Sequence, residues 1–186
     1  MKLLDFTDCS VANCIPLLIQ QNVGGWSVFF NRSWEEYKVG FNDSQGNYWL
    51  GNELLSQLTV SGRYKLKFDL QSRENTSNWY SAEYSTFRVL NETYDYMLEV
   101  AGYRGNSGYD AFGENNGIMF STYDRDNDLH SGNCAILKGG GFWYTRCALC
   151  SVNGYQERYE SHFYWYGLAQ GTWHLETSRM WLQCKK

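Results

Sequence analysis

A short acidic stretch offers the plainest chemistry in this chain. Residues 121–140 read STYDRDNDLHSGNCAILKGG, and Asp124, Asp126 and Asp128 occupy alternate positions shortly before Cys134. When the backbone turns, carboxylates with this spacing can converge on one hard cation, because calcium accepts about six to eight oxygen ligands from side chains and carbonyls. The stretch therefore predicts a calcium loop. The alternative is a solvated turn of Asp and Asn residues, which is common for an isolated acidic run.

The EF-hand calcium pattern does not fit this stretch. A loop that begins at Asp124 has Leu129 at the position where an EF-hand needs glycine, and Ala135 at the position of its final glutamate. A calcium loop here must therefore be of another kind.

Composition excludes two classes of protein. The formal net charge is -4 over 186 residues, and no basic run interrupts the mixed charges, so a phosphate-binding surface for nucleic acid is not expected. The longest nearly apolar run, CIPLLI, is about a third of the roughly 18 residues that cross a bilayer, so no membrane insertion is expected. The length suits a single domain.

Cysteines and glycosylation motifs favour an extracellular, secreted protein. An even number of cysteines, six, could form three bridges in an oxidising compartment. Four N-x-[ST] sequons fit a secreted glycoprotein, and they start at Asn31, Asn42, Asn75 and Asn91. The first residues include Asp5 and Asp8 where a signal peptide would be apolar, so we expect either a removed signal or a fragment with an added methionine.

The elements that would position the acidic stretch are mostly strands. Residues 63–71 alternate apolar and polar side chains, which predicts a strand with one buried face. Residues 85–90 and 94–103 are rich in β-branched and aromatic residues and predict a meander with that strand. Helical spacing of apolar residues predicts short helices over 33–41 and 51–59. From about Gly105 the periodicity ends until residues 176–183, and a loop region of this length is usually functional or held by bridges and metal.

Several ordered sequence blocks resemble one known family. NNGIMFSTYDRDNDLHSGNCA, then GFWYTRC and VNGYQ, together with the earlier GGWSVF, WEEYKVGF and NYWLGNELLSQLT, are similar to the fibrinogen-related (fibrinogen C-terminal) domain family. The resemblance implies an α+β fold with a mostly antiparallel central sheet, short helices and a large loop region stabilised by calcium and a disulfide. It implies a single domain over 1–186, with a shortened N-terminal segment at 1–23 and a loop-rich calcium- and ligand-binding region at 105–172.

The resemblance also implies how the acidic stretch is used. Calcium (Ca2+) would be held by the carboxylates of Asp126 and Asp128 and by the backbone carbonyls of His130 and Gly132, with Asp124 in a supporting place. The histidine would then act through its carbonyl, and an exposed loop imidazole is the simpler interpretation of its side chain.

The same resemblance implies one disulfide bridge. Cys134 and Cys147 would be bridged, whereas the pairing of Cys9, Cys14, Cys150 and Cys184 stays open among three connectivities. The CxxC of Cys147 and Cys150 resembles a redox or zinc element, but no second ligand pair with fitting spacing supports that interpretation.

A ligand site beside the second bridged cysteine follows from the family pattern. The peptide bond Arg146-Cys147 would be cis, next to a small aromatic pocket. The pocket walls carried over by position are Tyr144, Tyr155, Tyr164, Trp173 and His174. For each of these side chains, ordinary aromatic packing is the competing interpretation.

The chain departs from the family pattern at this wall. Ala148 stands where many members have histidine, and Leu137 and Lys138 replace polar and acidic groups of the fibrin-knob-binding members. A lysine there opposes a cationic peptide end, so fibrin-type knob binding is not expected and binding of acetylated sugars is weakened. A neutral or anionic ligand fits better.

The function implied by the resemblance is recognition. The leading hypothesis is a calcium-binding module of the ficolin and tachylectin type that binds glycans, with acetylated sugars as one class, in innate recognition. The alternative is an extracellular interaction or signalling domain that binds a receptor or matrix partner, with oligomer formation through an upstream region absent from this chain. Catalysis is not expected, because His130, His162 and His174 accompany no recognisable nucleophile motif.

Overall fold

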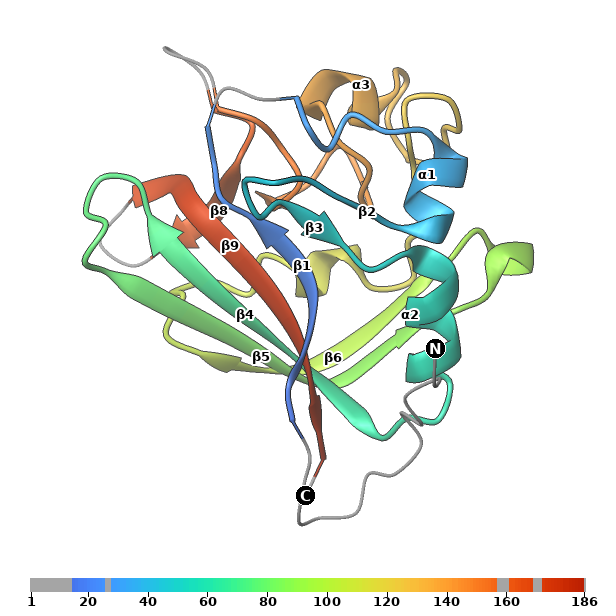
Figure 1. Ribbon diagram of the computed structural model, residues 1–186, viewed down its shortest axis with the longest axis horizontal. Coiled ribbons are helices and arrows are strands. Elements are labelled where there is room, and N and C mark those ends of the chain that lie inside the picture. Colours follow the sequence, from blue (N-terminus) through green and yellow to red (C-terminus); the bar gives the residue numbers. More distant parts are fainter. Residues whose placement is uncertain (1–14, 26–27, 157–160, 169–171, 186) are drawn as a thin grey trace.

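The computed structural model describes residues 15–25, 28–156, 161–168 and 172–185. Within these ranges one antiparallel sheet has the strand order β2-β3-β1-β9-β4-β5-β6, and β7 and β8 join it through β9 (Figure 1). The strands are β1 (Leu17–Asn22), β2 (Phe41–Asn42), β3 (Tyr48–Trp49), β4 (Tyr64–Ser72), β5 (Trp79–Val89), β6 (Leu98–Gly105), β7 (Cys150–Ser151), β8 (Tyr164–Leu168) and β9 (Thr172–Cys184).

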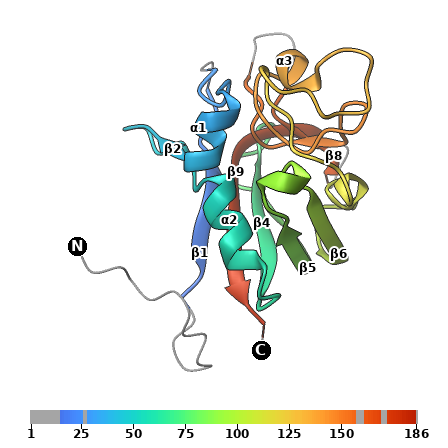
Figure 2. The same ribbon diagram turned by 90° about the vertical axis from the view of Figure 1, so that its right-hand side faces the viewer.

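Five short helices accompany the sheet in the described ranges. They are α1 (Trp34–Val39), α2 (Asn52–Thr59), the 3-10 helices η1 (Glu92–Tyr94) and η2 (Gly113–Asn115), and α3 (Cys134–Lys138). The long loops around α3 lie at one end of the molecule, opposite the carboxyl end of β9 (Figure 2). No helix among the described residues has the length and apolar character needed to span a bilayer.

The predicted meander is confirmed, with a longer second strand and a shorter third one, since β6 starts at Leu98 and residue 94, the expected start, lies in η1. In β4 the side chains of Leu66, Phe68 and Leu70 are fully buried while their neighbours are partly exposed, as alternation requires. β5 begins at Trp79, before the expected start of 85, because Gln71 of β4 already pairs with this tryptophan. The 13-residue β9 pairs with β1, β4 and β8 and so holds the two halves of the sheet together.

Both predicted helices are present. α1 begins with a capping box, in which the Ser33 hydroxyl accepts from the Glu36 backbone N–H and the Glu36 carboxylate accepts from the Ser33 N–H. α1 ends at Gly40, whose φ of +91° suits glycine and where a Cβ would lie 2.5 Å from the Leu50 carbonyl oxygen. Glycine here lets the first helix pack closely against the segment that leads into α2.

We expect Ser33→Ala to lower the free energy of unfolding by about 1 kcal/mol, since it removes the side-chain half of the capping box. Denaturant unfolding of the two proteins measures this difference. The substitution also destroys the sequon at Asn31, so Asn31→Gln, which removes the sequon and keeps the cap, is the matched control. Equal losses from both variants would assign the effect to the glycosylation motif and contradict the cap.

Strand β1 was not predicted, and its buried amides connect the sheet to the loop region. The Gln20 Nε2 donates to the Val152 carbonyl oxygen at 3.0 Å, and the Asn22 Nδ2 donates to the carbonyl oxygens of Val152 and Gly154 at 3.1 and 3.0 Å. Both side chains are almost completely buried, so these hydrogen bonds satisfy groups that would otherwise be costly to bury. They fix the segment that follows β7.

The core is unusually aromatic. A continuous network of tryptophan, tyrosine and phenylalanine rings runs between the sheet and the loops, with many edge-to-face pairs. The largest fully buried side chains are Trp49, Trp143 and Trp165. The high aromatic content of the sequence is therefore mainly a packing feature.

Candidate functional site

The acidic stretch forms a compact loop that is tied to the rest of the domain. Ser121 pairs with Phe142 as an isolated bridge, and the Asn127 side chain donates to the Phe120 carbonyl oxygen at 2.8 Å. The Asn133 side chain donates to the Thr122 carbonyl oxygen at 2.9 Å, which closes the loop on itself. The loop geometry is thus set largely by amide and hydroxyl side chains.

The Asp124 side chain has a structural role in this loop. Its Oδ1 accepts from the backbone N–H of Trp34 at 2.9 Å and from the Thr122 hydroxyl at 2.7 Å. The carboxylate therefore anchors the acidic loop to the first turn of α1. Its expected supporting role beside a cation stays a prediction.

Asp126 and Asp128 are brought together. Asp128 accepts from the backbone N–H groups of His130 and Cys134 at 2.8 and 2.7 Å, and its own N–H donates to Asp126 Oδ1 at 3.2 Å. Burial raises the pKa of the Asp128 carboxyl, and the Asp126 charge adds to this, against the lowering effect of the two backbone hydrogen bonds. Two adjacent carboxylates that repel one another are a fitting donor set for a hard cation.

His130 and Gly132 interact through the imidazole. The Nδ1 of His130 lies 2.9 Å from the Gly132 carbonyl oxygen and 3.0 Å from the Gly132 backbone nitrogen. When Nδ1 carries no proton it accepts from the N–H, and the Gly132 carbonyl oxygen is then left with its lone pairs for another partner. The expected carbonyl ligand is compatible with that tautomer.

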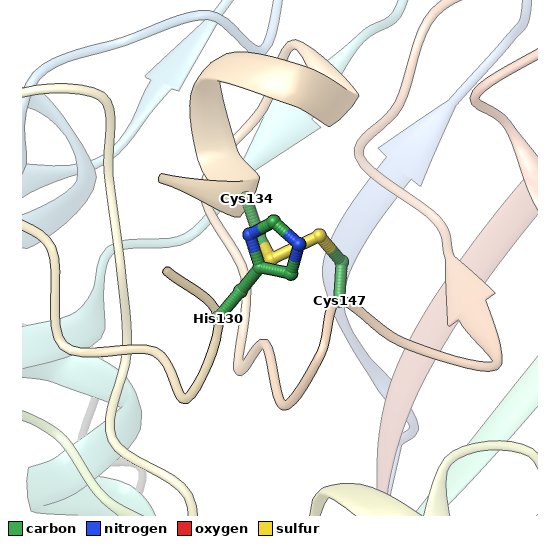
Figure 3. A group of neighbouring side chains, drawn as sticks. All are labelled: His130, Cys134 and Cys147. Carbon is green, nitrogen blue, oxygen red and sulfur yellow. A yellow bond between two sulfur atoms is a disulfide. The ribbon is translucent and has the colours of Figure 1, made fainter. Parts of the chain in front are cut away.

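Cys134 and Cys147 form the expected disulfide, with a Cα–Cα distance of 5.4 Å. The imidazole of His130 lies beside the two sulfur atoms (Figure 3), and the three potential ligand atoms are within 4.8 Å of one another. Because both sulfurs are consumed in the bridge, no thiolate remains to hold a metal here. The group is a histidine packed on a disulfide.

The even number of cysteines does not lead to three disulfide bridges, because one cysteine is unbridged. Cys150 is a free thiol, fully buried on β7, where it takes a core position opposite Trp165. Cys184 is disulfide-bonded. Cys9 and Cys14 lie outside the described residues, as does most of the N-terminal segment expected over residues 1–23.

The segment around Cys147, at the far end of the disulfide, is the second part of the candidate site. The Arg146-Cys147 peptide bond is cis, as expected. The Leu129 N–H donates to the Thr145 carbonyl oxygen at 2.9 Å, and the Thr145 hydroxyl donates to the Cys147 carbonyl oxygen at 3.1 Å. The acidic loop and the segment with the cis bond are therefore connected by both a disulfide and a hydrogen bond.

A pocket of about 310 Å³ lies beside this segment. Its lining comes from the segment after the bridge, from β8 and the residues just before it, and from the start of β9, and consists of Ala148, Leu149, Ser161, Tyr164, Tyr166, Trp173 and His174. The hydroxyl of Tyr164 donates to the Ala148 carbonyl oxygen at 2.9 Å. Burial raises the pKa of Tyr164 far above its usual value, so the hydroxyl stays protonated and keeps this hydrogen bond at neutral pH.

Three of the expected wall residues line the pocket, and two do not. Tyr164, Trp173 and His174 are in the lining. Tyr144 is fully buried and its hydroxyl donates to the Gly140 carbonyl oxygen at 2.8 Å, so it is part of the core. Tyr155 lies against Gly139 and pairs with the His162 ring at 5.0 Å, away from this lining.

The other two expected positions, Arg146 and Cys147, are not among the lining residues. Arg146 is exposed and Cys147 is half-buried, and the next residue, Ala148, lies in the lining. The absence of a histidine at that position leaves a small apolar side chain at the wall. Lys138 holds its ammonium 5.3 Å from the centre of the Tyr164 ring, so a positive charge borders the pocket.

Sequence reasoning missed Leu149, Ser161 and Tyr166. Tyr166 could have been found by its spacing, because Tyr164 and Tyr166 share one face of a strand and Trp165 the other. Strand β8 itself was not predicted, since it has only five residues and no alternation of charge marks it. Ser161 has no comparable signal.

Comparisons with known proteins identify the family and the fold. A family model described as the C-terminal globular domain of fibrinogen beta and gamma chains matches residues 2–185. Techylectin-5A of Tachypleus tridentatus is 38% identical over 82% of this chain and 51% of its own length, and angiopoietin-related protein 2 of Homo sapiens is 39% identical over 86% of this chain and 33% of its own length. The fibrinogen-like globe domain of human ANGPTL2 has a TM-score of 0.82 at 37% identity, over 92% of this chain and 81% of that one.

Proposed function

The chain belongs to the family of fibrinogen C-terminal globular domains, and we propose that it is an extracellular recognition module in which a calcium-ordered loop supports a glycan-binding pocket. The family is non-catalytic. The observation that carries the proposal is the connection between the acidic loop and the pocket through the bridge from Cys134 to Cys147. The chain spans about half the length of techylectin-5A and a third of angiopoietin-related protein 2, so functions of longer proteins come to it only as proposals.

Calcium would be held by the carboxylates of Asp126 and Asp128 and the carbonyls of His130 and Gly132. The fit rests on the two adjacent carboxylates and on the tautomer of His130 that leaves the Gly132 carbonyl free. When bound, the cation supplies charge neutralisation and order to a loop whose acidic residues otherwise repel each other. Its role is structural.

A hydrogen bond, a disulfide and a peptide bond connect the acidic loop to the pocket wall. Asp128 accepts from the Cys134 N–H, Cys134 is bridged to Cys147, and Ala148 follows directly in the pocket wall. An ordered loop therefore holds the wall in place without contacting the ligand. This predicts that calcium affects ligand binding indirectly.

The pocket chemistry favours a neutral or weakly anionic ligand. Among the described residues, its lining contains no lysine, arginine, aspartate or glutamate, and its polar side-chain groups are the hydroxyls of Ser161, Tyr164 and Tyr166, the indole N–H of Trp173 and the imidazole of His174. Lys138 beside Tyr164 opposes a cationic peptide end. The volume of about 310 Å³ is at the small end for ligand pockets, which suits one sugar residue.

A protein partner is the second candidate. Its support is the similarity to angiopoietin-related protein 2 and the exposed apolar side chains of Leu129, Ile136 and Leu137 around α3. Exposed apolar side chains on a helix and on the loop that precedes it are the kind of surface that a protein partner covers. Competition by free sugars separates the two candidates, because a protein-only surface does not lose its partner to them.

A glycan array probed with and without EDTA tests the leading proposal. We expect selective binding that is lost in EDTA, and we expect Tyr164→Ala to weaken it about tenfold because an aromatic wall is removed. Tyr164→Phe keeps the ring and loses the hydrogen bond to Ala148, so it should retain most of the affinity. Tyr94→Ala, at an exposed tyrosine on η1, is the control for a general surface effect.

Ala148→His is a second test of the pocket, since it introduces the histidine that many family members have at this position of the wall. Binding of acetylated glycans only after this substitution would show that the native protein is not an acetyl-group lectin, and the protein-partner candidate would then lead. If neither Tyr164→Ala nor Ala148→His changes the binding of the selected glycan, the pocket is not the site.

A further inference from the structure

Three exposed aromatic rings form a row that begins at the pocket. Tyr109, Tyr166 and Trp173 are 41, 37 and 47% exposed. The Tyr166 ring lies 4.7 Å from Trp173 and 5.4 Å from Tyr109, centre to centre, in edge-to-face arrangements. Tyr166 and Trp173 line the pocket and Tyr109 does not, so the row leads out of the pocket to Tyr109.

The backbone around the row holds the rings in place. The Trp165 indole N–H donates to the Tyr109 carbonyl oxygen at 3.1 Å, and the Tyr166 N–H donates to the Leu149 carbonyl oxygen at 2.8 Å. Gly167, with a φ of +67°, lets Tyr109 approach so closely that a Cβ at this position would lie 2.8 Å from the tyrosine Cβ. Rings that are already fixed lose little side-chain freedom when a ligand binds.

We propose that this row is a second subsite that stacks a neutral pyranose ring of an oligosaccharide whose terminal residue occupies the pocket. The inference rests on the proposed glycan function and adds the size and chemistry of the ligand. The faces of a pyranose carry C–H groups while its hydroxyls point outward, so a sugar ring can lie on an aromatic surface and keep its hydroxyls in water. Continuity with the pocket places the second sugar beside the first.

Exposure and charge favour this occupant. A contiguous group of exposed aromatic side chains is a feature that marks ligand or partner sites. The Glu74 carboxylate lies 3.5 Å from His174 Nδ1 at the pocket lining, whereas the three members of the row are themselves uncharged, so the row offers stacking and no charge pairing. An uncharged sugar chain matches a neutral aromatic row better than an ionic ligand does.

Titrations with N-acetylglucosamine and with its linear tetramer, chitotetraose, test the subsite. We expect the native protein to bind the tetramer about tenfold more tightly than the monomer, because stacking on a second aromatic surface is added. Tyr109→Ala should weaken tetramer binding about fivefold and leave monomer binding unchanged within about twofold. Tyr166→Ala should weaken both, since this ring belongs to the pocket and to the row.

Two further variants keep the result interpretable. Tyr94→Ala removes another exposed tyrosine, at the opposite end of the β5–β6 hairpin, and should change neither affinity. Tyr109→Leu preserves apolar packing over Gly167 without an aromatic face, so it replaces Tyr109→Ala if that variant unfolds.

The outcomes separate the subsite from the proposed function. Equal affinity for monomer and tetramer, or no effect of Tyr109→Ala on the tetramer, overturns the subsite while the pocket remains supported by Tyr164→Ala. Failure to bind either probe also overturns the subsite. The glycan array then tests separately whether the protein binds any other glycan.

Discussion

Removal of calcium with EDTA is expected to lower the free energy of unfolding by about 4 kcal/mol when the cation is otherwise present at about a thousand times its dissociation constant. A ligand that binds only the folded chain stabilises it by mass action, and the paired carboxylates of Asp126 and Asp128 exist only in the folded loop. For a domain of 186 residues this corresponds to a fall of roughly 8 to 16 °C in the melting temperature. Calorimetry in calcium and in EDTA measures it.

Two substitutions distinguish loss of the cation from damage to the loop. Asp126→Asn removes a charge but few hydrogen bonds, so it should cost stability in calcium and almost none in EDTA. Asp128→Ala also removes the acceptor of the His130 and Cys134 N–H groups, so it should destabilise the protein in both media. Glu114→Gln, at an exposed carboxylate on η2, is the matched control. An unchanged melting temperature of the native protein in the two media would contradict the calcium assignment.

The pH dependence gives an independent signature. The folded pKa of Asp128 is raised, mainly by burial, so without calcium the folded chain binds this proton more tightly than the unfolded chain does. The stabilising contribution of the protonated group is then complete below the unfolded pKa and is lost as pH rises through the folded pKa. Calcium requires the ionised carboxylate, so the stability gained from calcium should grow over the same pH interval.

Replacing both bridged cysteines, Cys134→Ala with Cys147→Ala, is expected to lower the free energy of unfolding by about 3 kcal/mol, because opening a loop whose ends are 13 positions apart restores chain entropy to the unfolded state. Alanine suits the buried position of Cys134 and keeps the backbone N–H that donates to Asp128. Calcium binding should therefore survive in a weakened form. Chemical denaturation and calcium titration of the double variant measure both effects.

Cys150→Ala is the matched control for the bridge. It removes a buried cysteine that is a free thiol, so its cost should come only from lost packing and stay near about 1 kcal/mol. Recovery of Cys134 or Cys147 as a free thiol in the correctly folded native protein, by peptide mapping without reduction, would contradict the assigned pairing. A loss no larger than that of the control would show that the bridge contributes little.

Much of the candidate site could be predicted from the sequence, because the patterns that indicate it involve residues close together in the chain. The alternate aspartates lie within one loop, and the chemistry of carboxylates points to a cation whatever surrounds them. The bridge and the cis bond came from the resemblance of ordered sequence blocks, and the structure contains both. The hydrogen bond between Asp124 and the start of α1 could not be predicted from the sequence, because its partner Trp34 is 90 positions away in the chain.

By itself the sequence determined the family, the period-two strand β4, the two capped or amphipathic helices and the residues of the acidic loop, since each depends on neighbours a few positions apart. Only the tertiary structure decided which aromatic side chains are core and which face a ligand. Tyr144 and Tyr166 look alike in sequence, but Tyr144 is fully buried in the core, whereas Tyr166 is partly exposed and lines the pocket. The reason is physical: burial is set by distant elements such as β1 and β9 that pack around a ring, and no local pattern records which of them will cover it.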